Sequence, residues 1–191
     1  MIQKYEFRAA DISGLLEITV FNAADNRGCL TKDYSKKVFE EHGIYYDLAE
    51  VFYTTSRKGV IRALHFQRVK QQPKLVRCIM GHVWDVVVDL RKDSPTFKMW
   101  RSFDLTGTND KELLIPAGCA HGYLVLEDSV VSYKCAEAFY GEYDDGIVWN
   151  DPELGVAWPL ELVGGEDQVI LSEKDRNLQT FAQFINREGG F

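Results

Sequence analysis

The segment PKLVRCIMGHVWDVVVDLR, residues 73–91, indicates the fold class because it contains two strand patterns in succession. Its second half alternates between two faces, since successive side chains of a β-strand point to opposite sides. One face is apolar (Trp84, Val86, Val88, Leu90), and the other mixes valines with carboxylates (Val83, Asp85, Val87, Asp89). Gly81 lies between the two patterns and predicts a hairpin bend. The segment therefore predicts antiparallel strands around a partly polar interior; the alternative is that Asp85 and Asp89 face solvent or pair with Arg77 or Arg91.

Similar strand patterns follow one another along most of the chain. They are separated by turn residues at intervals of roughly ten residues, as in a sandwich or a barrel. The expected strands span residues 14–21, 48–56, 60–67, 96–105, 111–116, 121–128 and 129–139. Helices are expected only at residues 35–43 and from Ser172 onward, where a serine can cap each helix. With no internal repeat or linker, residues 1–191 are predicted to form one domain, an antiparallel barrel with minor helices.

The composition is that of a soluble globular protein. The 191 residues are 46% hydrophobic and 27% charged, and the formal net charge of −7 opposes non-specific binding to nucleic acid or an anionic membrane. No signal-peptide core and no run approaching 18 apolar residues is present. The four cysteines (Cys29, Cys78, Cys119, Cys135) form no CxxC pair, which is typical of reduced thiols. We therefore expect a cytoplasmic protein whose cations must be gathered locally to bind an anionic ligand.

The strand pattern VIRALHFQ, residues 60–67, carries polar residues whose burial costs free energy unless a partner meets them. Strict alternation places His65 and Gln67 on one side and Arg62 on the other. A pocket shared by Arg62 and His65 therefore requires a bulge, a twist or a strand end between them, and bulges do occur beside active sites. Taken alone, a histidine on a strand is more often a structural group than a catalyst.

The turn IPAGCAHGYL, residues 115–124, delivers His121 at the start of a strand. Its P-x-G-x-x-H spacing is similar to the second metal motif of cupin barrels. A metal cupin also supplies ligands from an earlier strand, commonly an H-x-H pair and a glutamate, whereas that strand provides only His65 here. Two histidines make an incomplete set of metal ligands. We therefore predict no metal and no cofactor.

Six blocks occur in a fixed order within residues 27–175: VIRALHFQ, PKLVRCIMGHVWDVVVDLRKDSPTF, LLIPAGCAHGYLVL, VSYK, GIVWNDPELGVAWPL and LSEKD. In this order they resemble the dTDP-4-dehydrorhamnose 3,5-epimerases, metal-free cupin barrels that form homodimers. The resemblance implies an all-β fold, an antiparallel double-stranded β-helix (cupin or jelly-roll) barrel with minor peripheral helices. It also implies an isomerase that inverts carbons 3 and 5 of a 4-keto-6-deoxy sugar on a nucleoside diphosphate. Such a reaction needs a base on one face of the ring, an acid on the other, and stabilisation of an enolate oxygen.

By this resemblance His65 is the base, and Asp175 in LSEKD orients it and stabilises its protonated form. Imidazole suits this task because its ordinary pKa lies near working pH. Tyr133 in VSYK is by resemblance the proton donor on the opposite face. Without the resemblance, Asp175 would belong to a capping box that starts at Ser172, and Tyr133 would be an ordinary barrel tyrosine. Asp85 is the reserve partner of His65.

The same resemblance implies the substrate-binding residues. Lys74 in PKLVRC is similar to a cation near the enolate and phosphate oxygens. The remaining diphosphate and sugar contacts are Arg27, Arg62, His121, Asp144 and Lys174. A diphosphate explains why an acidic protein would gather arginines, lysines and a histidine in one place.

Groups that hold the nucleobase in the family differ here. The family's R-G-F-F-x-E-S segment is RGCLTKDY, with Cys29 and Lys32 in place of an aromatic residue and a glutamate. A tyrosine that stacks on thymine is Ala138, with Phe139 or Tyr140 as possible substitutes. Because glutamate to lysine reverses a charge, we predict a nucleotide other than dTDP, with GDP or CDP as candidates. A dTDP-4-dehydrorhamnose 3,5-epimerase proper is the alternative.

Two further departures lie near the catalytic strand, and the first of them is the third group that recognises the base in the family. The family's Q-D-N triplet is EVF, residues 50–52, and R-G-L-H has become RALH. The alanine, Ala63, adds a methyl group where backbone is expected to approach the ligand.

Other classes of function make different predictions. A non-catalytic cupin that binds sugar nucleotides, such as a sensor, would lack His65, Tyr133 or Asp175, and all three are present. A metal-dependent cupin oxygenase or isomerase would carry stoichiometric metal. A metal-free 3,4-ketoisomerase would also form an enolate but would move the carbonyl group.

Overall fold

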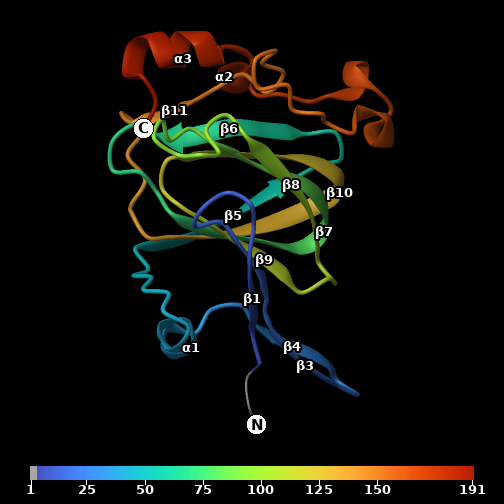
Figure 1. The fold of residues 1–191 in the computed structure, drawn as a ribbon. Coiled ribbons are helices and arrows are strands. Elements are labelled where there is room, and N and C mark those ends of the chain that lie inside the picture. Colours follow the sequence, from blue (N-terminus) through green and yellow to red (C-terminus); the bar gives the residue numbers. More distant parts are fainter. Residues whose placement is uncertain (1–3) are drawn as a thin grey trace.

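The computed structural model describes residues 4–191, which are mostly β-strand (Figure 1). No helix in this range is long and apolar enough to cross a bilayer. The helices are α1 (Lys36–Glu41), α2 (Glu173–Arg176) and α3 (Phe181–Glu188), with 3₁₀ turns at Leu160–Val163 and Glu166–Gln168. The strands are β1 (Glu6–Ala9), β2 (Leu16–Thr19), β3 (Phe21–Asp25), β4 (Gly28–Lys32), β5 (Glu50–Ser56), β6 (Ile61–Gln67), β7 (Lys74–Asp89), β8 (Trp100–Thr106), β9 (Lys111–Ile115), β10 (Cys119–Cys135) and β11 (Asp144–Gly146).

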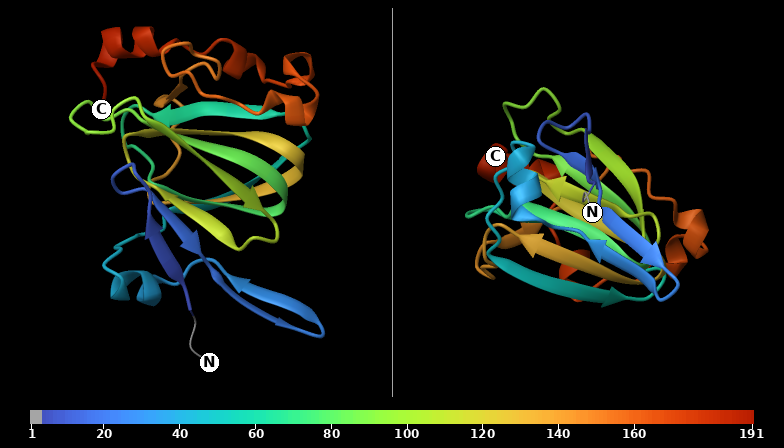
Figure 2. Two further views of the ribbon diagram at one scale, coloured as in Figure 1. Left: turned by 45° about the vertical axis from the view of Figure 1, so that its right-hand side comes forward. Right: turned by 90° about the horizontal axis from the view of Figure 1, so that it is seen from below.

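Nine of these strands form one antiparallel sheet that wraps into a barrel (Figures 1 and 2). Its order is β1-β2-β9-β7-β10-β6-β11, with β5 added on β10 and β8 added on β7. The long strands β7 and β10 pair with each other from end to end, apart from register shifts in the middle. Apolar side chains such as Val83, Val87 and Leu105 fill the interior. The prediction of an all-β antiparallel barrel with minor peripheral helices is confirmed.

The predicted hairpin at Gly81 is wrong, because β7 runs unbroken through this residue. Gly81 has a φ of +82°, and a Cβ there would lie 2.2 Å from the carbonyl oxygen of Asp128 in β10. The glycine therefore serves a close approach of two strands and not a chain reversal. β10 also runs unbroken where two strands are expected, with register shifts between Val125 and Val131. Each long strand consequently pairs with different neighbours along its two halves, β9 and then β8 in the case of β7.

Strand β6 contains the irregularity that a pocket shared by Arg62 and His65 requires. In its pairing with β10, His65 lies opposite His121 and Arg62 lies opposite Tyr123. Three steps along β6 therefore match two steps along β10, which is a β-bulge. The extra residue allows Arg62 and His65 to face the same cavity. The three polar residues of VIRALHFQ thus line one cavity.

A glycine of β10 faces this bulge because the two strands approach closely. A Cβ at Gly122 would lie 2.5 Å from the Cβ of Ala63 and 2.7 Å from the carbonyl oxygen of Arg62. Ala63 itself is fully buried in the core. Its methyl group therefore packs between strands in the core of the barrel.

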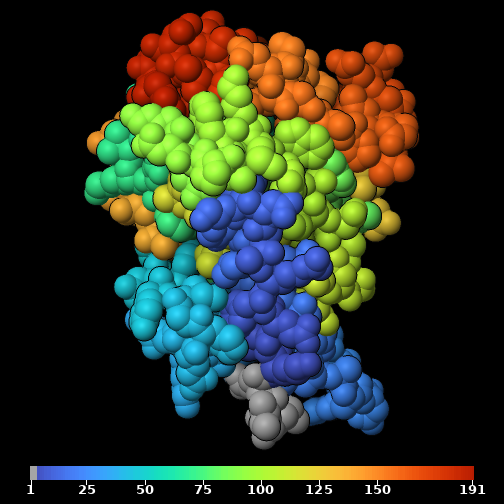
Figure 3. Space-filling view, viewed as in Figure 1, coloured from blue at the N-terminus to red at the C-terminus, as the bar shows by residue number. Residues whose placement is uncertain are grey.

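The C-terminal segments cover the upper end of the barrel as it is drawn in Figures 1 and 3. The sequence predicts one helix from Ser172 onward, whereas two short helices form, separated by residues 177–180. The Ser172 hydroxyl caps α2 by accepting a hydrogen bond from the backbone N–H of Asp175 at 3.0 Å. Thr180 caps α3 in the same way, and Phe184 of α3 packs against Phe66 of β6. This packing holds α3 beside the strand that carries His65, and Asp175 of α2 contacts His65 itself.

The β3–β4 hairpin and α1 lie beyond the opposite end of the barrel (Figure 2). Helix α1 begins after Ser35 and ends within the predicted range. The base of the hairpin is tied to the barrel by Lys134, whose ammonium donates to Asp33 at 2.8 Å and to the buried Glu112 at 2.9 Å. Burial raises the pKa of Glu112 to about 7. The hairpin is therefore anchored at its base, while its turn points away from the barrel.

Candidate active site

Seven of the nine residues predicted for the site line one cavity of about 190 Å³. They project from β6, β7, β10, β11 and α2. Asp175 reaches this cavity through His65, and Arg27 lies elsewhere. The predicted lining residues are Arg62, His65, Lys74, His121, Tyr133, Asp144 and Lys174, and beside them lie Phe52, Thr54, Phe66, Gln67, Gln72 and Phe139.

His65 and Asp175 form a close pair at the edge of the cavity. Nε2 of His65 lies 2.6 Å from Oδ1 of Asp175, and the histidine side chain is 32% exposed. Burial acts to raise the pKa of Asp175, but His65 and Ser172 outweigh it and hold this pKa below its ordinary value. An ionised carboxylate only accepts hydrogen bonds, so Nε2 carries the proton. In the neutral imidazole Nδ1 then carries the lone pair that a general base requires.

Asp175 serves the helix cap and the cavity at once. Its backbone N–H donates to the Ser172 hydroxyl, while its side chain contacts His65. The S-x-x-D pattern therefore does start a helix, but the carboxylate does not complete a capping box. The interpretation as a helix cap therefore applies to the backbone of Asp175, and the interpretation as the partner of His65 applies to its side chain.

His121 and Asp85 form a second imidazole–carboxylate pair, in which both residues are buried. Nε2 of His121 lies 2.8 Å from Oδ2 of Asp85. Asp85 is therefore not the partner of His65, and it does not face solvent. Asp89 does pair with Arg91, whose Nε donates to its Oδ1 at 2.8 Å.

No group of three or more His, Cys, Asp or Glu side chains within residues 4–191 is arranged to hold a metal ion. The two imidazoles that line the cavity are each hydrogen-bonded to a carboxylate. Independence from metals stays a prediction, which elemental analysis of the purified protein tests.

Tyr133 lines the same cavity from β10. Its ring stacks on Phe52 with a centroid distance of 4.7 Å, and it meets His121 edge-on at 6.0 Å. Burial, followed by the neighbouring Tyr123 and Asp85, raises the pKa of Tyr133 well above its ordinary value. The phenol is therefore protonated at neutral pH and is able to give a proton to a carbanion.

Cations from three elements meet the cavity. Burial lowers the pKa of Lys74 below its ordinary value. Arg62 is held by Ser56, whose hydroxyl accepts a hydrogen bond from Nε at 2.9 Å. Lys174 forms an ion pair with Asp144. Such a group of cations is suited to phosphate oxygens and to a developing enolate.

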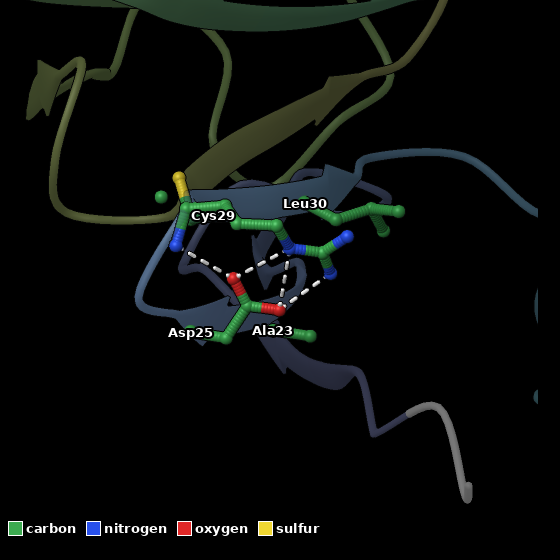
Figure 4. Close-up of a pocket in the computed structure, with 6 residues that line it drawn as sticks. Ala23, Asp25, Cys29 and Leu30 are labelled. Carbon is green, nitrogen blue, oxygen red and sulfur yellow. Dashed lines mark hydrogen bonds and ion pairs between the residues drawn. The ribbon is translucent and has the colours of Figure 1, made fainter.

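Arg27 is not brought to this cavity. It follows β3 at the turn of the hairpin, where its side chain is 85% exposed and its Nη2 lies 2.6 Å from Oδ2 of Asp25. A separate hollow of about 250 Å³ surrounds these residues (Figure 4). Within one chain Arg27 therefore lies apart from the other predicted cations, and its role as a substrate contact stays a prediction. The sequence does not reveal this separation, because it does not show where the β3–β4 hairpin lies relative to the barrel.

The residues that depart from the family pattern fall in two places. Cys29 and Lys32 lie on β4, outside the cavity. Phe52, from the EVF triplet, lines the cavity itself, and so does Phe139, which follows Ala138 and is a candidate substitute for the missing tyrosine. Reversal of charge at Lys32 therefore leaves the cavity of the same chain unchanged, whereas the two aromatic residues alter its wall.

Gln67 is a residue of the site that sequence reasoning left without a role. It is buried, and its Nε2 donates to the carbonyl oxygens of Lys70 at 2.7 Å and Ala138 at 3.2 Å. Its Oε1 accepts from the backbone N–H of Tyr140 at 2.6 Å. Gln67 thereby fixes the loop that carries Phe139 at the cavity. The signal was the third polar residue of VIRALHFQ.

Comparison with known proteins gives a consistent result. A sequence model of the dTDP-4-dehydrorhamnose 3,5-epimerase family matches residues 9–183. An enzyme of that name from Methanothermobacter thermautotrophicus is 43% identical over 175 residues, which are 91% of this chain and 93% of the relative.

Two solved structures share both the fold and the sequence pattern. The epimerase of Bacillus anthracis, solved with TDP and pyrophosphate bound, is 38% identical with a TM-score of 0.86, over 93% of this chain and 100% of its own. The epimerase of Legionella pneumophila, in complex with dTDP-4-keto-L-rhamnose, is 36% identical with a TM-score of 0.87, over 93% of each chain.

Proposed function

The chain belongs to the dTDP-4-dehydrorhamnose 3,5-epimerase family and is an isomerase that acts on a nucleotide sugar, and on this premise we propose that its substrate is a 4-keto-6-deoxy sugar linked to dTDP. The sequence favoured GDP or CDP, but relatives at about 40% identity carry the dTDP name. Lys32, the strongest argument against dTDP, lies on the same hairpin as Arg27 and outside the cavity of its own chain. A cytoplasmic location, expected from four cysteines without disulfides, is part of the proposal.

The observation that carries this proposal is that the His65–Asp175 pair and Tyr133 meet at one cavity with Lys74. His65 removes the proton from the carbon beside the carbonyl, and the electron pair moves onto the carbonyl oxygen. Lys74 stabilises the resulting enolate. As the carbonyl re-forms, Tyr133 gives its proton to the same carbon from the opposite face, which inverts it. Arg62 and Lys174 bind the diphosphate, so that the protein's net charge of −7 is overcome locally.

The experiment that tests this function is a panel of 4-keto-6-deoxy sugars on dTDP, GDP, CDP and UDP, incubated with the enzyme in heavy water. We expect inversion and deuterium uptake beside the carbonyl on the dTDP sugar, with a higher kcat/KM than on the other three. Mass spectrometry and NMR identify the nucleotide and the carbon that exchanges. A higher kcat/KM on the GDP or CDP sugar would favour the nucleotide predicted from the sequence over dTDP. Movement of the carbonyl group would indicate a ketoisomerase.

The position of Arg27 supports a homodimer in which the hairpin of each copy reaches the cavity of the other. Arg27 is remote from the cavity of its own chain, yet the family resemblance makes it a phosphate contact. Large apolar side chains on nearby elements are exposed and offer a surface for a second copy. They are Leu30, Tyr45, Leu48, Val51 and Tyr53.

Mixed dimers provide a test of this arrangement. Arg27→Ala and His65→Asn are each expected to be strongly impaired. Co-expression should restore about a quarter of wild-type activity, because half of the dimers are mixed and each contains one intact cavity in an isologous pair. The control is co-expression of Arg27→Ala with the double variant Arg27→Ala/His65→Asn. No dimer in that mixture contains an intact cavity. A mixture without recovery, or a monomer mass by light scattering, would contradict shared cavities.

A further inference from the structure

The EVF segment at the start of β5 contributes an aromatic ring to the cavity. In the pairing of β5 with β10, Phe52 lies directly opposite Tyr133. The two rings are nearly parallel, with an interplanar angle of 11° and a centroid distance of 4.7 Å. This is an offset-stacking distance for aromatic side chains.

Phe52 covers one face of the Tyr133 ring while remaining at the cavity. Phe52 is 40% exposed and is part of the cavity wall, whereas Tyr133 is buried. His121 meets the tyrosine edge-on with an interplanar angle of 73°. His121 is itself fixed by Asp85. The phenol ring therefore has Phe52 stacked on one face and also meets the ring of His121 edge-on.

The residue proposed to remove the proton and the residue proposed to return it are supported by different elements of the fold. His65 is held by Asp175 from α2, whereas Phe52 stacks on Tyr133. Tyr133 is the group that Phe52 touches. A change at Phe52 that loosens the tyrosine should therefore affect the return of the proton more than its removal.

We propose that Phe52 is a positioning residue that holds the phenol of Tyr133 in the geometry needed to protonate the enolate. This inference rests on the proposed function, because it takes Tyr133 as the proton donor. Proton transfer requires the donor oxygen close to the accepting carbon, and small displacements of a reacting group lower rates strongly. The aromatic ring in place of the family's polar triplet thus has a role in the reaction, beyond filling the wall.

The test compares two products in heavy water with the dTDP sugar. One is inverted sugar with deuterium, which requires Tyr133; the other is sugar that has exchanged its proton without inversion, which requires only His65. For Phe52→Leu we expect the ratio of inversion to exchange to fall about tenfold, because the tyrosine is no longer held. Phe52→Tyr keeps an aromatic stack and should restore the ratio. Phe139→Leu is the matched control for this ratio, since Phe139 also lines the cavity, whereas Phe52 is the ring stacked on Tyr133.

The outcomes separate this inference from the function beneath it. Wild-type enzyme that neither inverts nor exchanges the sugar would overturn the proposed function. An unchanged ratio in Phe52→Leu, or an equal fall in Phe139→Leu, would overturn the role of Phe52 while leaving the function intact. A ratio that falls in both Phe52→Leu and Phe52→Tyr would also overturn it, since the stack would not be the cause. Equal melting temperatures of the variants show that the ratio does not follow stability.

Discussion

His65→Asn is expected to abolish deuterium exchange at the carbons beside the carbonyl and, with it, all inversion. Asparagine cannot accept a proton, so the reaction loses the group that starts it. Removal of a general base typically lowers a rate by about 10²–10⁴-fold. Exchange measured by mass spectrometry in heavy water checks this prediction.

The chain offers a matched control for this substitution. His82 also pairs with a carboxylate, with Nε2 at 2.7 Å from Oδ1 of Asp104, but it lies outside the cavity. His82→Asn should therefore retain wild-type exchange. Substantial exchange in His65→Asn would exclude His65 as the base. Equal loss in His82→Asn would show that the assay reports folding and not catalysis.

The strand patterns predicted the barrel well because alternation records which face of a strand is buried. They did not show that β7 and β10 each pass through an expected break. Gly81 is a residue type typical of turns. Only the proximity of the Asp128 carbonyl oxygen to its Cα shows that it lies at a close approach within a continuous strand. The same limit applies to β6, where the bulge between Arg62 and His65 follows from its pairing with β10. Such features depend on the neighbouring strand, which a local pattern does not contain.

The candidate site was predicted largely from motif order, and the points that the sequence left open have a common cause. Asp85 and Asp175 are both carboxylates that could meet a histidine, and only three-dimensional distance assigns Asp175 to His65 and Asp85 to His121. Arg27 belongs to a hairpin whose location relative to the barrel is invisible in the sequence. Contacts between distant segments decide these assignments, and composition and spacing constrain them weakly.

Tyr133→Phe is expected to stop inversion while proton exchange at the same carbons continues. The variant keeps the ring, and therefore the stack on Phe52 and the edge contact with His121, but it lacks the proton to be donated. His65 still removes a proton and can return a deuteron to the same face. Inversion should fall by about 10²-fold or more. NMR distinguishes the inverted sugar from the exchanged but uninverted sugar.

The pKa of Tyr133 adds a second test of the same role. Because burial raises this pKa above its ordinary value, the phenol keeps its proton throughout the neutral range. Wild-type inversion should therefore show no decline from ionisation of Tyr133 below about pH 10, the ordinary pKa of tyrosine. Full inversion in Tyr133→Phe would exclude the tyrosine as the donor. If Tyr133→Phe loses exchange together with inversion, proton removal also depends on Tyr133. The assignment of proton removal to His65 and of proton return to Tyr133 would then be wrong.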